Sequence, residues 1–133
     1  MTVPEWRLGR AMEGYVTTQL LYVAAKLGIA DVLADGPCTG AEVARAVGAE
    51  PAALTRVLRG LAIEDIVVEF DDGRFGLTSL GASLPASQGA IIARGEVYYD
   101  AAAGLLDAVR DGGTAFERVH GERDILRMTP MGD

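Results

Sequence analysis

Cysteine and histidine are almost missing from this chain of 133 residues, in which Cys38 and His120 are the single examples of each type. One cysteine excludes an internal disulfide and a cysteine metal cluster. Together with one histidine it also falls short of the ligands that a zinc site uses, so we expect no bound metal. Because a lone thiol suits a reducing compartment, we expect the protein to be cytoplasmic.

Long apolar runs and a basic character are absent as well. The longest nearly apolar run, residues 20–25, is far too short to span a bilayer, so we expect no membrane contact. The first ten residues carry Glu5, Arg7 and Arg10 without an apolar stretch, which is unlike a signal peptide. The formal net charge of −7 disfavours nucleic acid and anionic lipid as partners.

The chain has instead many small and medium apolar side chains. Half of its residues are hydrophobic and only 6% are aromatic, which suits closely packed helices in a chain about one domain long. We predict a mainly α fold in a single domain over residues 1–133. A winged-helix-like core at residues 39–84, with one β-hairpin wing, would be flanked by long helices at 4–28 and 88–110.

The helix predicted at 4–28 carries an apolar stripe over about five turns. Its members recur at spacings of three and four: Leu8, Met12, Val16, Leu20, Val23 and Leu27. Gly28 is a natural stop, and Gly14 with the β-branched residues after it marks a place where the segment can divide into two helices. So broad an apolar face needs more cover than a small domain supplies, so we expect part of that cover to come from another molecule.

Local signals define the predicted winged-helix core. After a short helix at 29–34, Thr39 and Glu42 form a capping box at the start of one helix. Gly48 ends that helix, and Pro51 occupies the first turn of the next. The residues at 66–70 and 75–78 have strand character, and an Asp-Asp-Gly turn between them predicts a hairpin.

The predicted core is acidic where a DNA reader is basic. Residues 64–72 hold five acids and no Lys or Arg, and a phosphate backbone repels such a surface. Four arginines near the predicted reader helix and wing are read as a solvated face: Arg45, Arg56, Arg59 and Arg74. We therefore expect the fold to bind protein rather than nucleic acid.

The helix predicted at 88–110 also has a wide apolar face, formed by Ile91, Tyr98, Ala102, Leu105 and Val109. Short helical turns are expected after it at 116–119 and 124–128. Two such outer helices would interlock with those of a second copy in a mostly hydrophobic homodimer.

Four segments resemble the N-terminal dimerisation domain of bacterial and plant S-adenosylmethionine-dependent O-methyltransferases. They are LYVAAKLGIADVLADGP at 21–37, LTRVLRGLA at 54–62, FGLTSLGASL at 75–84 and GEVYYDAAAGLLDAVRDGGTAFERVHG at 95–121. The resemblance runs from about residue 8 to 127. It implies relatives that methylate phenolic or polyketide-derived aromatic metabolites, in secondary metabolism.

The resemblance also implies what this chain does not carry. In the family a following Rossmann-like domain binds S-adenosylmethionine through a glycine-rich loop, and it holds the catalytic residues. No strand here leads into such a loop, and Gly112-Gly113 follows a helix and reads as its cap. We expect no catalytic residue, no cofactor site and no methyl transfer by the chain alone. The final MTPMGD is compatible with a natural end or a cut one.

Several aromatic and apolar residues are candidates for contact with an aromatic small molecule. Trp6, Met12 and Tyr15 lie on the first helix, which in the family reaches toward the partner's active site, and Tyr98 and Tyr99 lie on the last. Relatives often have a tryptophan soon after that tyrosine pair, where this chain has only small or acidic residues at 100–103. His120 is read as a helix-end or interface residue rather than a general base, since no nucleophile is placed near it.

Three alternatives stay open at this point. The chain could be a stand-alone auxiliary or recruited small-molecule protein in metabolite biosynthesis. It could be one part of a split enzyme that pairs with a separate catalytic methyltransferase chain. A winged-helix transcriptional regulator is the third alternative, against which the charge distribution argues.

Overall fold

The computed structural model describes residues 3–121, which form two compact units that divide between Ile92 and Ala93. The helical turn expected at 124–128 lies outside the described residues. Among the helices of residues 3–121, none combines the length and apolarity that a bilayer crossing requires. Each unit is described below by itself.

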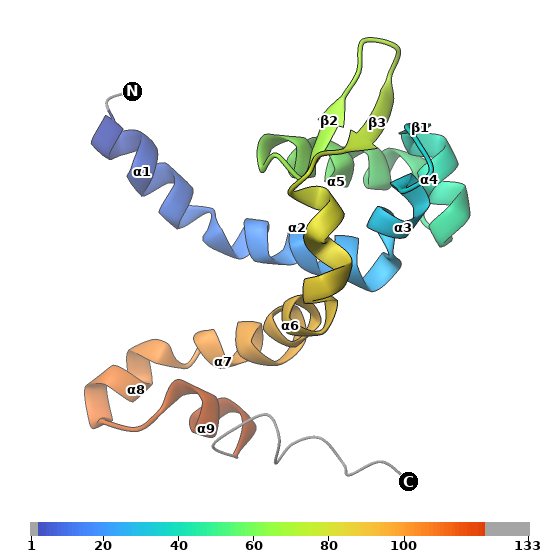
Figure 1. Ribbon diagram of the computed structural model, residues 1–133. Coiled ribbons are helices and arrows are strands. Elements are labelled where there is room, and N and C mark those ends of the chain that lie inside the picture. Colours follow the sequence, from blue (N-terminus) through green and yellow to red (C-terminus); the bar gives the residue numbers. More distant parts are fainter. Residues whose placement is uncertain (1–2, 122–133) are drawn as a thin grey trace, which may run out of the picture. The chain divides into compact units, whose positions relative to one another are not determined.

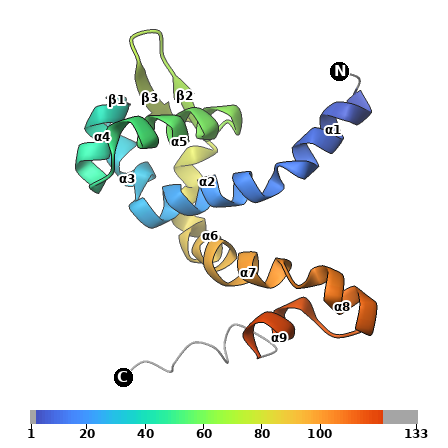
Figure 2. The same ribbon diagram turned by 180° about the vertical axis from the view of Figure 1, so that it is seen from behind.

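The first unit opens with two helices where the sequence predicts one long helix with a weak point. These are α1 (Val3–Met12) and α2 (Gly14–Leu27), and the break falls at Glu13, whose φ of −92° and ψ of 7° are not helical. Gly28 ends α2 with a φ of +73°, which a glycine adopts without strain, and α3 (Ile29–Leu33) follows. The break is therefore one residue before the glycine that predicts it. Figures 1 and 2 show α1 running beyond the helices of the core.

The two central helices follow the local signals closely. In α4 (Gly40–Val47) the Thr39 hydroxyl accepts from the Glu42 N–H, and the Glu42 carboxylate accepts from the Thr39 N–H, so the predicted capping box is confirmed. Helix α5 (Pro51–Ile63) begins at the proline, as expected. Its N-cap is Glu50, whose carboxylate accepts hydrogen bonds from two backbone N–H groups.

The wing has one strand more than the sequence predicts. The expected hairpin forms from β2 (Val67–Glu69) and β3 (Arg74–Leu77), and Gly73 in its turn has a φ of +83°. A two-residue strand, β1 (Cys38–Thr39), pairs antiparallel with β3 on its other side, which gives the order β1-β3-β2. The prediction of a hairpin alone was therefore incomplete. The hairpin stands out from the helices in Figure 1.

The hydrophobic core of the first unit lies among α2, α3, α4, α5 and the inner face of the sheet. Its largest fully buried side chains are Phe75, Ile29, Leu58, Leu61, Val43 and Val67. A 3₁₀ segment, η1 (Gly81–Ser87), contributes Leu84 to the same cluster. Helix α5 contributes an apolar stripe to this core, since Leu54, Leu58 and Leu61 recur at spacings of four and three and are all buried.

The helix predicted over 88–110 is not continuous. It consists of an α-helical turn, a π-helical segment and two further α-helices: α6 (Gln88–Ala93), η2 (Arg94–Tyr98), α7 (Tyr99–Ala102) and α8 (Leu105–Asp111). The Tyr99 N–H bonds the Arg94 carbonyl five residues back, which defines the π turn. The N–H groups of Ala103 and Gly104 donate to the carbonyls three residues back, in place of four. Helix α7 ends there, and α8 begins at Leu105.

The second unit explains the interruption at Gly104. This glycine is buried, and a Cβ on it would stand 3.0 Å from Val119 Cγ2 and 3.3 Å from the Ala115 carbonyl oxygen. Those residues belong to α9 (Ala115–His120), which occurs where a helical turn was expected. Close packing of α9 against the end of α7 therefore sets the break, and Gly112 ends α8 with a φ of +82°, as predicted.

Candidate dimerisation surface

Helix α1 and the start of α2 present large apolar side chains to solvent. Trp6, Leu8, Met12 and Tyr15 are 54%, 64%, 65% and 57% exposed. Leu20 and Val23, further along α2, are half-buried, and Ala24 and Ala25 are buried. The stripe predicted from the sequence therefore divides into a part that the core covers and a part that it leaves open. Exposed apolar groups gathered in this way mark an interaction surface.

The second unit has an open apolar face of its own on α8. Leu105, Leu106 and Val109 are 59%, 62% and 73% exposed. The residues that this unit buries are small ones, Ala101 and Ala108. The packing within the second unit thus leaves the larger side chains of α8 exposed. A wide apolar face was expected on the helix predicted at 88–110.

Three of the candidate ligand contacts lie in the first unit and two in the second. Arg10 on α1 places its guanidinium 5.3 Å from the centroid of the Trp6 ring. In the second unit the exposed Tyr98 ring lies 5.5 Å from that of Phe116, while Tyr99 is half-buried. The role of Trp6, Met12, Tyr15, Tyr98 and Tyr99 in ligand contact stays a prediction.

His120 has a structural role in the second unit. Its Nε2 lies 2.8 Å from the Val97 carbonyl oxygen, and its ring packs 4.9 Å from that of Phe116. It is also the last residue of α9, in agreement with the interpretation as a helix-end histidine. Together with Tyr99 and Arg118 it borders an open pocket of about 720 Å³. Arg118 itself is paired with Asp111.

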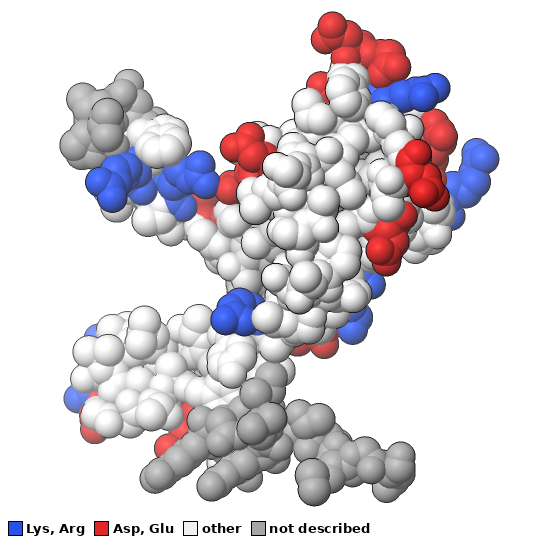
Figure 3. Space-filling model, viewed as in Figure 1, with Lys and Arg blue, Asp and Glu red and all other residues white. Residues whose placement is uncertain are grey.

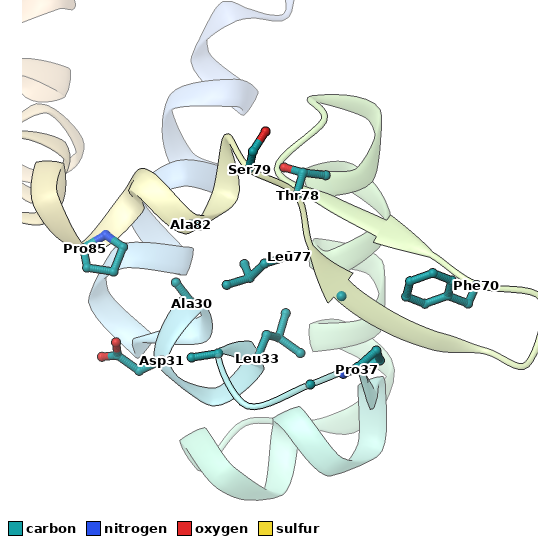
Figure 4. Close-up of a pocket in the computed structure, with 13 residues that line it drawn as sticks. Ala30, Asp31, Leu33, Pro37, Phe70, Leu77, Thr78, Ser79, Ala82 and Pro85 are labelled. Atoms are coloured by element: carbon teal, nitrogen blue, oxygen red, sulfur yellow. The ribbon is translucent and has the colours of Figure 1, made fainter.

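A pocket in the first unit was not predicted. It is an open hollow of about 550 Å³ between α3, the inner end of the hairpin and η1 (Figure 4). Apolar groups make up most of its lining, with Thr78 and Ser79 at one edge and Asp31 at another. Its residues come from separate segments, so no local sequence signal could have revealed it.

The charge distribution of the core is unlike that of a DNA reader. Figure 3 shows acidic side chains gathered at the tip of the hairpin. Two of the four nearby arginines are paired with acids of the wing: Arg59 lies 3.6 Å from Glu69, and Arg74 lies 3.6 Å from Asp72. These pairs offset positive charge that phosphate contacts would require.

Two glutamates at helix starts have shifted acidities. The N–H groups of Ala53 and then Ala52 hold the pKa of the Glu50 carboxyl below its ordinary value of 4.5. The backbone N–H of Thr39, and after it the Thr39 hydroxyl, lowers the pKa of Glu42 in the same way. Hydrogen bonds to the ionised carboxylate favour that form. Both shifts belong to helix caps and not to a catalytic group.

The described residues do not fit an S-adenosylmethionine site. The sheet in residues 3–121 is small and antiparallel, whereas the family's cofactor domain binds at the end of a parallel strand followed by a glycine-rich loop. Within the same residues, no three His, Cys, Asp or Glu side chains gather to hold a metal ion.

Comparison with known proteins decides the family. The family model of the O-methyltransferase dimerisation domain matches residues 10–87. This chain belongs to that family. The match covers α2 to η1 completely and includes the end of α1.

The relatives are methyltransferases much longer than this chain. The phenazine O-methyltransferase PhzM of Lysobacter antibioticus is 44% identical over 113 residues, which are 81% of this chain and 33% of that protein. The crystal structure of LaPhzM superposes with a TM-score of 0.86 at 39% identity, over 96% of this chain and 40% of that one. The crystal structure of human N-acetylserotonin methyltransferase in complex with SAM superposes with a TM-score of 0.81 at 25% identity. That superposition covers 92% of this chain and 39% of the human one. The chain thus spans about a third of the length of its curated relatives.

Proposed function

We propose that this chain pairs with a second copy of itself through the open apolar faces of α1, α2 and α8, and that residues 1–133 act as one dimerisation domain. The main support for this proposal is the exposure of three apolar side chains on α1. Trp6, Leu8 and Met12 are each more than half exposed, in a chain that belongs to the O-methyltransferase dimerisation family. A stable interface buries about 1,200–2,000 Å², and apolar side chains at its centre contribute most of the affinity. The open faces supply such side chains.

The activity belongs to a larger assembly than this chain. The match with the relative PhzM covers only 33% of that protein, and the small antiparallel sheet of residues 3–121 is unlike the family's cofactor domain. We propose that the domain serves an S-adenosylmethionine-dependent methyltransferase of aromatic secondary metabolism in the cytoplasm, with the catalytic domain supplied on the same or a separate chain. By itself the chain should transfer no methyl group.

The exposed aromatic side chains support a further part of the proposal. Once a catalytic domain is supplied, Trp6, Met12, Tyr15, Tyr98 and Tyr99 would contact an aromatic substrate. Titration of the assembled enzyme with phenazine tests this. Replacing Tyr98 or Tyr99 by Ala should weaken binding by about tenfold if its ring stacks on the ligand, whereas Val68→Ala, at an exposed position on the wing, should leave the affinity unchanged. Equal affinities in all three variants would remove Tyr98 and Tyr99 from the site.

Sedimentation of the purified chain tests the dimer. Wild type should sediment as a dimer, and a Leu8→Lys/Met12→Lys variant should sediment as a monomer with an unchanged helical circular dichroism spectrum, because both side chains are exposed in the single chain. Val68→Lys, at an exposed position on the wing, is the matched control and should leave the dimer intact. A monomeric wild type, or a double variant that still pairs, would refute the proposal.

A further inference from the structure

The ionic contact between Arg10 and Glu64 joins the projecting helix α1 to the core. Arg10 Nη2 on α1 donates to Glu64 Oε2 at 2.8 Å, across 54 residues of sequence. Thr17 Oγ1 on α2 donates to the other oxygen, Oε1, at 3.4 Å. Arg10 and Thr17 are two helical turns apart, so they share a face of the helix pair, and the break at Glu13 lies between them. One carboxylate therefore holds both sides of the break.

Glu64 is well fixed to act in this way. It is the C-cap of α5, and the turn after it is closed by hydrogen bonds from the Asp65 and Ile66 N–H groups to the carbonyls of Ala62 and Leu61. The Thr78 hydroxyl donates to the Asp65 carbonyl at 2.5 Å and so holds the same turn from the side of the wing. The Glu64 side chain is only 20% exposed, against 50% for that of Arg10.

The two helices differ in how firmly they are held. Helix α2 packs on α5 so closely that a Cβ on Gly60 would come within 2.9 Å of Leu20 Cδ1. Helix α1, in contrast, leaves Trp6, Leu8 and Met12 more than half exposed. At the start of α2, Gly14 adds backbone freedom, and a Cβ there would meet nothing within 4 Å. The direction of α1 is thus set at a weak point of the helix.

We infer that Glu64 is the positioning residue that sets the angle of α1 and so arranges the open apolar face for pairing. Arg10 links Glu64 to Trp6 near the start of α1, since its guanidinium lies over the Trp6 ring as well as against the Glu64 carboxylate. Fixing a binding segment beforehand lowers the ordering cost of association. The effect of Glu64 on pairing rests on the proposed dimerisation through α1. The anchoring of α1 by Glu64 does not depend on it.

Trp6 is the single tryptophan of the chain, so its fluorescence reports on α1 without a label. Glu64→Gln removes the charge that Arg10 contacts, and Glu69→Gln removes the charge that Arg59 contacts on the wing. Time-resolved anisotropy, measured in the Leu8→Lys/Met12→Lys background that should be monomeric, should show added segmental motion of Trp6 in E64Q and none in E69Q.

The outcomes separate anchoring from dimerisation. E64Q should also weaken the dimer by about 3- to 10-fold, since each dimer holds two such pairs, while its unfolding midpoint stays close to that of E69Q. Unchanged Trp6 motion in E64Q would overturn the anchoring. Increased motion with an unchanged dimer affinity would support the anchoring and refute pairing through α1.

Discussion

Gly81, at the start of η1, lies directly against the backbone of Ile66, and a Cβ on it would overlap the Ile66 carbonyl oxygen. The Gly81 N–H also donates to the Thr78 hydroxyl at 3.0 Å, and the oxygen of that hydroxyl lies 3.0 Å from the Ile66 carbonyl oxygen. This contact brings the segment after the wing against Ile66, the residue just before β2. Only a glycine allows the approach, because backbone atoms cannot move aside as the end of a side chain can.

A substitution at Gly81 should therefore be costly. Gly81→Ala should lower the free energy of unfolding by about 2–4 kcal/mol, because the added methyl forces η1 away from Ile66. The control is Gly89→Ala in α6, where a Cβ would meet nothing within 4 Å and where alanine favours the helix by about 1 kcal/mol. Urea denaturation of both variants measures the difference. Equal stability of G81A and wild type would contradict the close packing.

Acid should weaken the start of α5 through Glu50. Because its folded pKa is depressed below 4.5, the ionised carboxylate stabilises the folded state above that value. The contribution is lost as the pH falls through the folded pKa. At neutral pH wild type should be more stable than Glu50→Gln, and the gap should close on acidification. Urea midpoints measured across that pH range check the trend, and a gap that persists at low pH would contradict it.

His120 should support the second unit rather than any catalysis. His120→Ala removes the contact with the Val97 carbonyl and the packing on Phe116, and should cost about 1–2 kcal/mol. Hydrogen exchange should show the loss as faster exchange in residues 94–121. Asp107→Asn, an exposed change in the same unit, should leave exchange nearly unchanged. Normal protection in H120A would show that the ring is dispensable.

The isolated chain should not bind the methyl donor. Calorimetric titration with S-adenosylmethionine should give no binding heat, since the described sheet is antiparallel and has no parallel strand that leads into a glycine-rich loop. A longer relative that includes the catalytic domain serves as the positive control. Micromolar binding by this chain alone would show that the cofactor site was wrongly placed outside it.

The winged-helix core could be predicted because its signals are local and agree with one another. The Thr39–Glu42 capping box, the stop at Gly48 and the proline at the start of α5 each act within a few residues, and the structure contains all three. The apolar stripe of α5 repeats the same assignment at the level of packing. The open face of α1 was also expected, since its stripe continues past what the core can cover.

The structural features that the sequence did not predict depend on contacts between residues far apart in the chain. Strand β1 has two residues and no periodicity, and it exists because Cys38 and Thr39 pair with Phe75 and Arg74. The break before α8 depends on the contact of Gly104 with Val119, which no helical period contains. The pocket beside η1 likewise needs segments that only the fold brings together.

Helix α1 is a segment whose apolar side chains the folded core does not use. Trp6, Leu8 and Met12 are more than half exposed, so their identity is not constrained by the interior of the first unit. If α1 pairs as proposed, substitutions there would change which copy the chain binds while leaving the folded core intact. Among duplicated copies of such a domain within one cell, self-recognition would then diverge first at this helix and keep the subunits of parallel pathways from mixing.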